Sequence, residues 1–174
     1  HDTRIHMNLD NPLAMPSTIE PLTAWIASEE KPDWDAVLVR VLDTFGCPIG
    51  TLHTWDTGKE RLMVRAYRGI PEFLLPKMSE IPIGKGMAGI AAERREPVQV
   101  CNLQTDQSGV ARPSARDTKM EGSLTIPLLH QGRLYGTLGI AKPVEHEFPS
   151  EEIEALQTVG DAICRRLQAE QMHQ

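Results

Sequence analysis

The feature that most constrains the fold is a long β-hairpin between residues 122 and 141. Its strands, Gly122-Ser-Leu-Thr-Ile-Pro and Tyr135-Gly-Thr-Leu-Gly-Ile140, alternate on either side of the turn His130-Gln131-Gly132-Arg133. A period of two is typical of a strand whose two faces differ. Because a tight hairpin joins antiparallel strands, the segment favours an antiparallel sheet over a parallel, doubly wound one.

Further strands are predicted ahead of this hairpin. Residues 49–55 and 62–67 alternate on either side of the turn Thr57-Gly58-Lys59, and a short strand follows at residues 98–101. In the first, one side carries Ile49, Thr51, His53 and Trp55. In the second, Leu62, Val64 and Ala66 are expected on one side, and Met63, Arg65 and Tyr67 on the other.

Helices are predicted at both ends of the chain and after a glycine turn. Ser17 or Thr18 can cap the first helix, and Asp33 caps a second that ends at Gly46. Residues 87–94 form a third, and Ser150 begins the last. Their apolar stripes recur at helical spacing, so we expect them to pack on the sheet.

Composition restricts the functional classes. The chain has 174 residues, enough for one domain with a full core, and a formal net charge of −6. Phosphate contacts need several Lys or Arg on one face, and no basic cluster occurs, so we expect no nucleic-acid partner. No apolar run approaches the roughly 20 residues of a membrane helix, and no signal-peptide pattern opens the chain. A cytoplasmic protein without membrane contact is predicted.

The sequence gives no pattern for a metal or a catalytic triad. The three cysteines, Cys47, Cys101 and Cys164, have neither zinc spacing nor the even number of a disulfide framework. The six histidines are scattered, and no Gly-x-Ser-x-Gly elbow occurs. We therefore predict no cofactor and no metal site.

Several segments, in their order and spacing, resemble a GAF domain over roughly residues 18–170. They are Leu62 to Pro71, Gly84-Lys-Gly-Met-Ala-Gly89, Pro97-Val-Gln-Val-Cys-Asn102, Ser123-Leu-Thr-Ile-Pro127, Gly136-Thr-Leu-Gly139 and Phe148-Pro-Ser-Glu-Glu. The resemblance implies an α+β, GAF/PAS-like, profilin-type fold with a central six-stranded antiparallel sheet. It places the terminal helices on one face, where they commonly dimerise, and a loop-covered ligand pocket on the other. Residues 1–17 are interpreted as a tail, disordered or introduced by cloning, and residues 171–174 as a C-terminal tail.

The glycine segment also resembles that of the free methionine-(R)-sulfoxide reductases, which are GAF enzymes. The positions of their three cysteines hold Met78, Ala88 and Arg116 here. Their chemistry needs one thiolate to attack the sulfoxide sulfur and another to resolve the adduct, so this chain lacks that mechanism. The signature of cyclic-nucleotide GAF domains is incomplete, and residues 102–121 contain no Cys or His for bilin attachment.

Ten residues are candidates for ligand binding. They lie on strands, at the glycine turn and in the long polar segment 102–121, and are His53, Trp55, Tyr67, Met87, Cys101, Asp106, Arg112, Arg116, Ser123 and Thr125. The strand aromatics could equally be half-buried sheet residues, and the two arginines could belong to a solvated loop. The turn Gly84-Lys85-Gly86 could cradle a phosphate, or it could simply be a tight turn.

These observations predict a non-catalytic, small-molecule-sensing domain of signal transduction. Ligand binding under the 102–121 loop would be coupled to the terminal helices, to a homodimer partner and to a fused or separate output module. One alternative is a redox enzyme of the sulfoxide reductase type that uses Cys101. Another is a structural dimerisation module with an occluded pocket.

Overall fold

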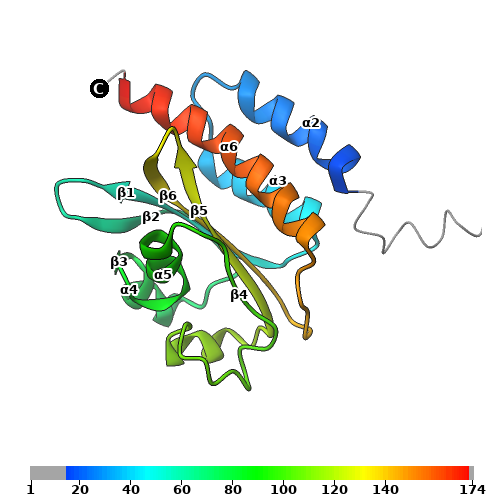
Figure 1. The fold of residues 1–174 in the computed structure, drawn as a ribbon, viewed down its shortest axis with the longest axis vertical. Coiled ribbons are helices and arrows are strands. Elements are labelled where there is room, and N and C mark those ends of the chain that lie inside the picture. Colours follow the sequence, from blue (N-terminus) through cyan, green and yellow to red (C-terminus); the bar gives the residue numbers. More distant parts are fainter. Residues whose placement is uncertain (1–14, 173–174) are drawn as a thin grey trace, which may run out of the picture.

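The fold is a six-stranded antiparallel sheet with helices on both faces (Figure 1). The computed structural model describes residues 15–172. The strands are β1 (Ile49–Asp56), β2 (Arg61–Arg68), β3 (Glu80–Pro82), β4 (Val98–Val100), β5 (Gly122–His130) and β6 (Arg133–Lys142). Their order across the sheet is β3-β2-β1-β6-β5-β4, so the long hairpin β5–β6 lies at its centre beside β1.

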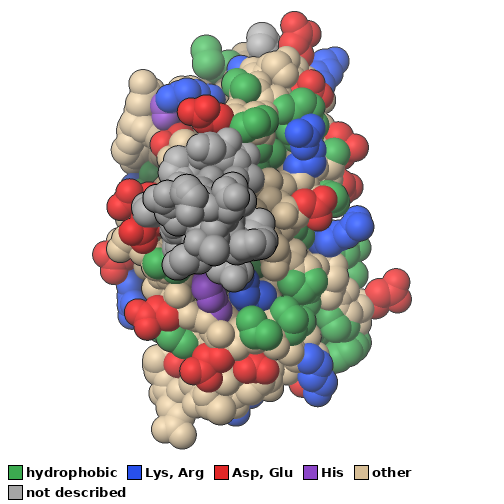
Figure 2. All heavy atoms as spheres, turned by 90° about the vertical axis from the view of Figure 1, so that its right-hand side faces the viewer, with side chains coloured by type: hydrophobic (Ala, Val, Ile, Leu, Met, Phe, Trp, Pro, Cys, Tyr) green, Lys and Arg blue, Asp and Glu red, His purple; other side chains and the backbone are tan. Residues whose placement is uncertain are grey.

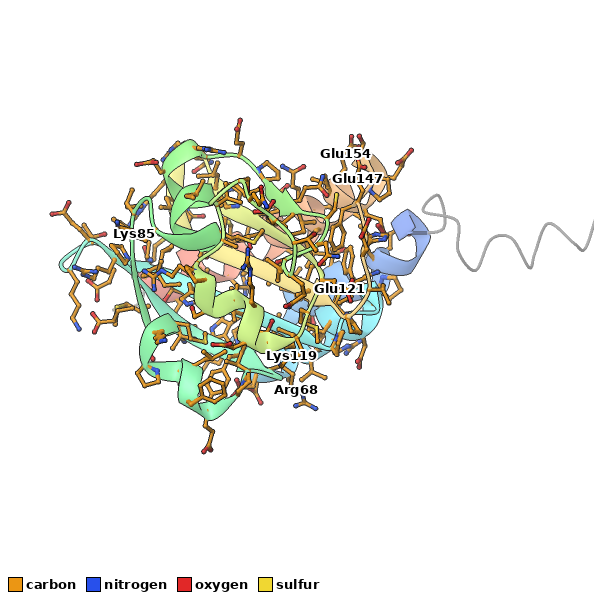
Figure 3. All side chains as sticks on the ribbon, turned by 90° about the horizontal axis from the view of Figure 1, so that it is seen from below. Arg68, Lys85, Lys119, Glu121, Glu147 and Glu154 are labelled. Carbon is orange, nitrogen blue, oxygen red and sulfur yellow. The ribbon has the colours of Figure 1, made fainter. Side chains whose placement is uncertain are left out.

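The helices form two unequal layers. They are α2 (Met15–Ser28), α3 (Trp34–Phe45), α4 (Leu75–Met78), α5 (Gly86–Arg94) and α6 (Ser150–Met172), with 3-10 helices η2 (Glu72–Leu74) and η3 (Pro113–Thr118). In Figure 1, α2, α3 and α6 lie on one side of the sheet and α4 and α5 on the other. Figure 3 looks at the second layer from below, with Lys85 at one edge and Lys119 toward the middle. The expected fold class is confirmed.

The main hydrophobic core fills the space between the sheet and the long helices. From β1, β5 and β6 it takes Leu52, Leu124, Ile126, Leu128, Leu138 and Ile140, and from α6 it takes Leu156, Val159, Ile163 and Leu167. A Cβ at Gly160 would lie 3.0 Å from the side chains of both Ile126 and Leu128. The last helix therefore packs directly on β5.

The predicted helix boundaries of α3 are confirmed. The side chain of Asp33 accepts hydrogen bonds from the backbone N–H groups of Asp35 and Ala36, and Gly46 ends the helix in the left-handed conformation. Helix α2 begins at Met15, so Ser17 and Thr18 lie within its first turn rather than ahead of it. Most of the tail expected at residues 1–17 lies outside the described residues, and α6 continues to Met172.

The expected alternation along β2 is wrong because the strand contains a bulge. Leu52 pairs with Ala66 and His53 with Val64, so Arg65 is an extra residue on β2. Ala66 consequently joins the main core, whereas Leu62 joins a small cluster on the opposite face with Ile81 and Ala92. Leu62 and Ala66 do not share a face as predicted.

The surface carries charges of both signs. On the face shown in Figure 2, acidic and basic side chains are intermixed, without a continuous basic stripe over the described residues in view. None of the helices in residues 15–172 has both the length and the apolar character that a bilayer-spanning helix needs.

Candidate functional site

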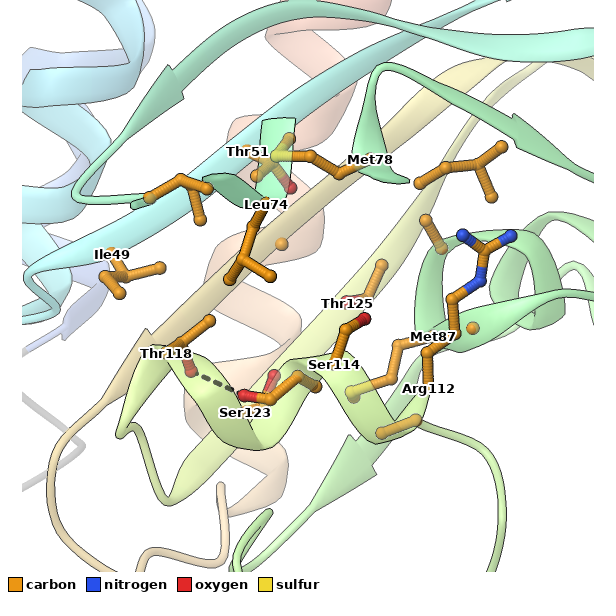
Figure 4. Close-up of a pocket in the computed structure, with 18 of the residues that line it drawn as sticks. Ile49, Thr51, Leu74, Met78, Met87, Arg112, Ser114, Thr118, Ser123 and Thr125 are labelled. Atoms are coloured by element: carbon orange, nitrogen blue, oxygen red, sulfur yellow. Dashed lines mark hydrogen bonds between the residues drawn. The ribbon is translucent and has the colours of Figure 1, made fainter. Parts of the chain in front are cut away.

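A cavity of about 190 Å³ lies between the sheet and the smaller helical layer. Its floor is formed by β1, β5 and β6, and its cover by α4, the start of α5 and the segment from Leu103 to Thr118. Figure 4 labels lining side chains from β1, β5, α4, α5 and the covering segment, with Ile49 at one end of the group and Arg112 at the other. The site therefore lies on the sheet face opposite the long helices.

The floor carries a row of hydroxyl groups. Thr51, Gly139 and Thr125 are directly opposite one another on β1, β6 and β5, and all line the cavity. A Cβ at Gly139 would lie 3.1 Å from Oγ1 of Thr125 and 3.3 Å from Oγ1 of Thr51. Glycine at this position keeps both hydroxyls accessible from the cavity.

His53 is the most buried polar residue of the floor, with 1% of its surface exposed. Its Nε2 donates a hydrogen bond to the carbonyl oxygen of Met78 at 2.8 Å, which leaves Nδ1 as the lone-pair acceptor. Nδ1 and Oγ1 of the cross-strand neighbour Thr137 are buried without a hydrogen-bond partner among the described atoms. Burial lowers the pKa of His53 against the opposing effect of the Met78 hydrogen bond, so the ring is neutral at neutral pH.

The glycine segment forms a tight turn at the cover. Gly84 and Gly86 both have positive φ angles, and the Gly84 N–H bonds to the carbonyl of Gly89 at 2.9 Å. A Cβ at Gly89 would lie 2.4 Å from the carbonyl oxygen of Pro82, so only glycine lets α5 approach β3 this closely. This agrees with the tight-turn interpretation, and phosphate binding there stays an untested alternative.

The polar segment 102–121 is held by its own hydrogen bonds. Gln104 donates to the carbonyl of Met120 at 2.8 Å, and Arg116 donates to the carbonyls of Leu103 and Asp106. Arg112 is different, because its Nη1 reaches outside the segment to the carbonyl of Lys77 at 2.8 Å. The Arg112 side chain thus bridges from the loop to the end of α4 at the cavity.

The structure brings five of the ten candidate residues together at the cavity. They are His53, Met87, Arg112, Ser123 and Thr125. The ligand-binding role of each stays a prediction.

The other five candidates do not line this cavity. Trp55 packs against the small cluster around Leu62, and Tyr67 is 45% exposed. Cys101 is exposed just beyond β4. Asp106 and Arg116 line an adjoining hollow within the loop, which shares Arg112 with the cavity.

Several lining residues were not among the candidates. Thr51 shares the strand alternation of His53, and this pattern was a signal that could have identified it. Leu74 lies on η2 and Lys77 on α4, two elements that were not predicted. Their approach to the cavity depends on the path of the chain between β2 and β3, for which the sequence offered no periodic pattern.

No cysteine lines the cavity in the described part of the chain. Met78 and Ala88, at two positions where the sulfoxide reductases carry cysteines, do line it, whereas Arg116 does not. Cys47 and Cys164 are buried, and desolvation raises the pKa of their thiols to about 11 and about 12. Across residues 15–172, no group of three or more His, Cys, Asp or Glu side chains is arranged to hold a metal ion.

Comparisons with known proteins agree with this architecture. A family model described as "GAF domain" matches residues 34–167. A comparison with curated protein sequences gave no significant match.

Among solved structures, three similar ones cover nearly the whole chain. The GAF domain of a phosphoenolpyruvate-protein phosphotransferase from Coxiella burnetii has a TM-score of 0.78 at 22% identity, covering 94% of this chain and 98% of that one. The free methionine-R-sulfoxide reductase from Neisseria meningitidis, in complex with its substrate, has a TM-score of 0.74 at 19% identity, covering 94% and 93%. The corresponding GAF domain from Acinetobacter has a TM-score of 0.74 at 15% identity, covering 91% and 96%.

At these identities the structural similarities show the fold alone. GAF domains of two phosphotransferases and a sulfoxide reductase share it, so the fold does not choose between a sensing role and a catalytic role. The sequence match extends over most of the chain and covers the whole sheet, the helices from α3 to α5 and most of α6. The chain belongs to the GAF domain family.

Proposed function

We propose that this protein is a non-catalytic GAF domain that senses a small molecule in signal transduction. The observation that carries the proposal is the cavity, which combines apolar walls, a hydroxyl-bearing floor and a cover of loop and short helices, without a thiol among its described lining residues. Sites of this kind, apolar with a few placed polar groups, are typical of ligand binding. A cytoplasmic location is part of the same proposal.

Successive residues of the floor strands face the cavity and the main core in turn, which provides a physical route for coupling ligand binding to the long helices. On β1, Thr51 lines the cavity and the next residue, Leu52, lies in the main core. On β5, Thr125 lines the cavity and Leu124 and Ile126 lie in that core, where α6 packs. A ligand that shifts a floor strand therefore changes the surface on which the long helices rest.

The proposed output is through the long helices α2 and α6, which pack against each other on the face opposite the cavity (Figure 1). A homodimer through these helices, or a fused or separate output module, would receive the change. Coupling requires that the ligand bind the two states with different affinities.

Native mass spectrometry of the purified protein beside its denatured mass tests the proposal. Extra mass that is lost on denaturation identifies a retained ligand, and the same spectrum gives the oligomeric state. Thermal unfolding with a small-molecule library extends the test, since a ligand that binds only the native state raises the Tm. A protein that carries no ligand and that no compound stabilises would support the alternative of a structural module instead.

A redox enzyme that uses Cys101 is the second candidate, because this is the exposed thiol among the described residues. Cys101 does not line the cavity, which argues against the redox-enzyme alternative. Turnover of a free methionine sulfoxide by the wild-type protein, abolished in Cys101→Ser, would establish the enzyme and refute the non-catalytic proposal.

A further inference from the structure

The charged residues that line the cavity are all cationic. Three of its lining residues, Lys77, Lys85 and Arg112, are cationic, and none of its described lining residues is Asp or Glu. Nor do these three cations form an ion pair anywhere in residues 15–172. A ligand in this cavity therefore meets three cations and no carboxylate among the lining residues; Asp106 belongs to the adjoining hollow.

Among the three cations, Arg112 is the one held in place by contacts at the cavity. Its Nη1 donates to the Lys77 carbonyl, and its stem lies over Gly86, where an added Cβ would be 3.3 Å from Cγ of Arg112. A guanidinium has five N–H donors, and the hydrogen bond to Lys77 uses one of them. The remaining donors suit the two oxygens of a carboxylate, whose planar geometry the guanidinium fork matches.

The other walls of the cavity are apolar. Leu74, Met78 and Ile81 come from the α4–β3 side, and Ile49 lies at the end of the group opposite Arg112 (Figure 4). The polar groups of the floor are uncharged hydroxyls and a neutral imidazole. The first turn of α5, with Gly86, Met87 and Ala88, also lines the cavity, so its positive end adds to the field of the three cations.

We propose that the ligand is a small monocarboxylate with an apolar body and no ammonium group. The carboxylate binds Arg112 with help from Lys77 and Lys85, and the body extends along the apolar walls toward Ile49. An amino acid fits less well, because the cavity would strip water from its ammonium group without offering a carboxylate in exchange. This inference rests on the proposed sensing function and names its ligand class.

The test uses three compounds that share one apolar body. 4-Methylpentanoate carries the carboxylate alone, leucine carries both the carboxylate and an ammonium group, and 3-methylbutylamine carries the ammonium group alone. A second series, 3-phenylpropanoate, phenylalanine and 2-phenylethylamine, tests a larger body. Calorimetric titration of the whole chain measures the Kd of each, at low and at high salt.

We expect the two plain carboxylates to bind, the amino acids to bind at least tenfold more weakly and the amines not to bind. Raising the salt concentration should weaken the carboxylates, as for any charge pair near the surface. Arg112→Gln should weaken them roughly 10- to 100-fold, the range for losing a hydrogen bond to a charged group. Arg61→Gln, an exposed cation on β2 outside the cavity, is the control and should leave the Kd unchanged.

Equal or tighter binding of the amino acids or amines would overturn the carboxylate inference and leave the sensing function intact. An Arg112→Gln protein with the wild-type Kd would also overturn it. If no compound of either series binds and the purified protein carries a ligand without a carboxylate, the inference again fails while the sensing function stands. If nothing binds, no library compound stabilises the protein and none is retained on purification, both proposals fail.

Discussion

Nε2 of His53 lies 2.8 Å from the carbonyl oxygen of Met78, so a hydrogen bond joins the middle of β1 to the end of α4. The ring must remain neutral for this arrangement to be stable, because 99% of the residue is removed from solvent. His53 is thus part of the cavity floor and also a link between the floor and the cover.

The buried position of His53 predicts a loss of stability at mildly acidic pH. Burial holds the pKa of His53 below its usual value of 6.5, so the unfolded chain takes up the proton more readily than the folded one. Stabilisation by the neutral ring is fully present above about pH 6.5 and is lost as the pH falls toward the lower folded pKa. Urea unfolding between pH 7.5 and 5 measures this slope.

The substitution His53→Gln removes the titrating group and keeps a hydrogen-bond donor at this position. Its amide can still donate to the Met78 carbonyl but does not titrate, so the slope between pH 6.5 and 5 should flatten. His130→Gln, in the β5–β6 turn region, is the matched control and should keep the wild-type slope. If the unfolding free energies of wild type and His53→Gln changed with pH in parallel, the acid sensitivity could not be assigned to His53.

A second link joins the end of α6 to the bulge of β2. Arg65 donates two hydrogen bonds to Glu170, at 2.9 and 2.8 Å, and Nε1 of Trp34 donates to the same carboxylate at 3.3 Å. The Arg65 hydrogen bonds are the main cause that holds the pKa of Glu170 below its usual range. Because both side chains are about one-third exposed, we expect Glu170→Gln to cost only about 1 kcal/mol of unfolding free energy.

The pH dependence of the Glu170 link comes from a charged group that the fold stabilises, whereas that of His53 comes from a charged form that the fold excludes. A carboxyl whose folded pKa is depressed stabilises the protein above its unfolded pKa, near 4.5, and the benefit disappears as the pH falls through the folded value. The difference in unfolding free energy between wild type and Glu170→Gln should therefore shrink below about pH 4. Glu154→Gln, also on α6, is the control, and an undiminished difference at low pH would refute the role of the ion pair.

The sequence was sufficient for the sheet and its layers because the hairpin β5–β6 and the helix stripes are local, periodic patterns. The predictions that Asp33 begins α3 and that Gly46 ends it were correct for the same reason, because a helix cap depends on a few neighbouring residues. The bulge at Arg65 was missed because it depends on which residues of β1 and β2 pair, and pairing is a property of two strands.

The cavity was only partly predictable. His53, Ser123 and Thr125 lie on regular strands, so alternation placed them on a shared face. Lys77 reaches the site through a four-residue helix, α4, whose sequence has no distinguishing period. Asp106 lies in irregular chain and Arg116 on the short helix η3, and the side chain of Arg116 bonds to the backbone of the 102–121 segment instead of lining the cavity.

The three thiols should differ strongly in reactivity. Cys101 is exposed, whereas Cys47 and Cys164 are buried with the pKa of each raised by desolvation, to about 11 and about 12. Because the thiolate is the reactive form, we expect one thiol to react rapidly with a disulfide reagent in the native protein and three after denaturation. Cys101→Ser should abolish the fast phase, and a fast phase that persists would show that a core thiol becomes accessible.

The hydrogen bond from Arg112 to the Lys77 carbonyl should restrain the 102–121 loop, because this side chain ties the loop to α4. Its removal in Arg112→Gln forfeits roughly 0.5–1.5 kcal/mol, which corresponds to a loop that opens about 2- to 10-fold more often. Limited proteolysis and amide hydrogen exchange of residues 102–121 measure this opening. Arg95→Gln is the matched control, because Arg95 makes the same kind of bond to the carbonyl of Gly132, at 3.1 and 3.0 Å, away from the cavity. Faster exchange confined to the loop, in Arg112→Gln alone, would establish the restraint, and equal exchange in the two variants would refute it.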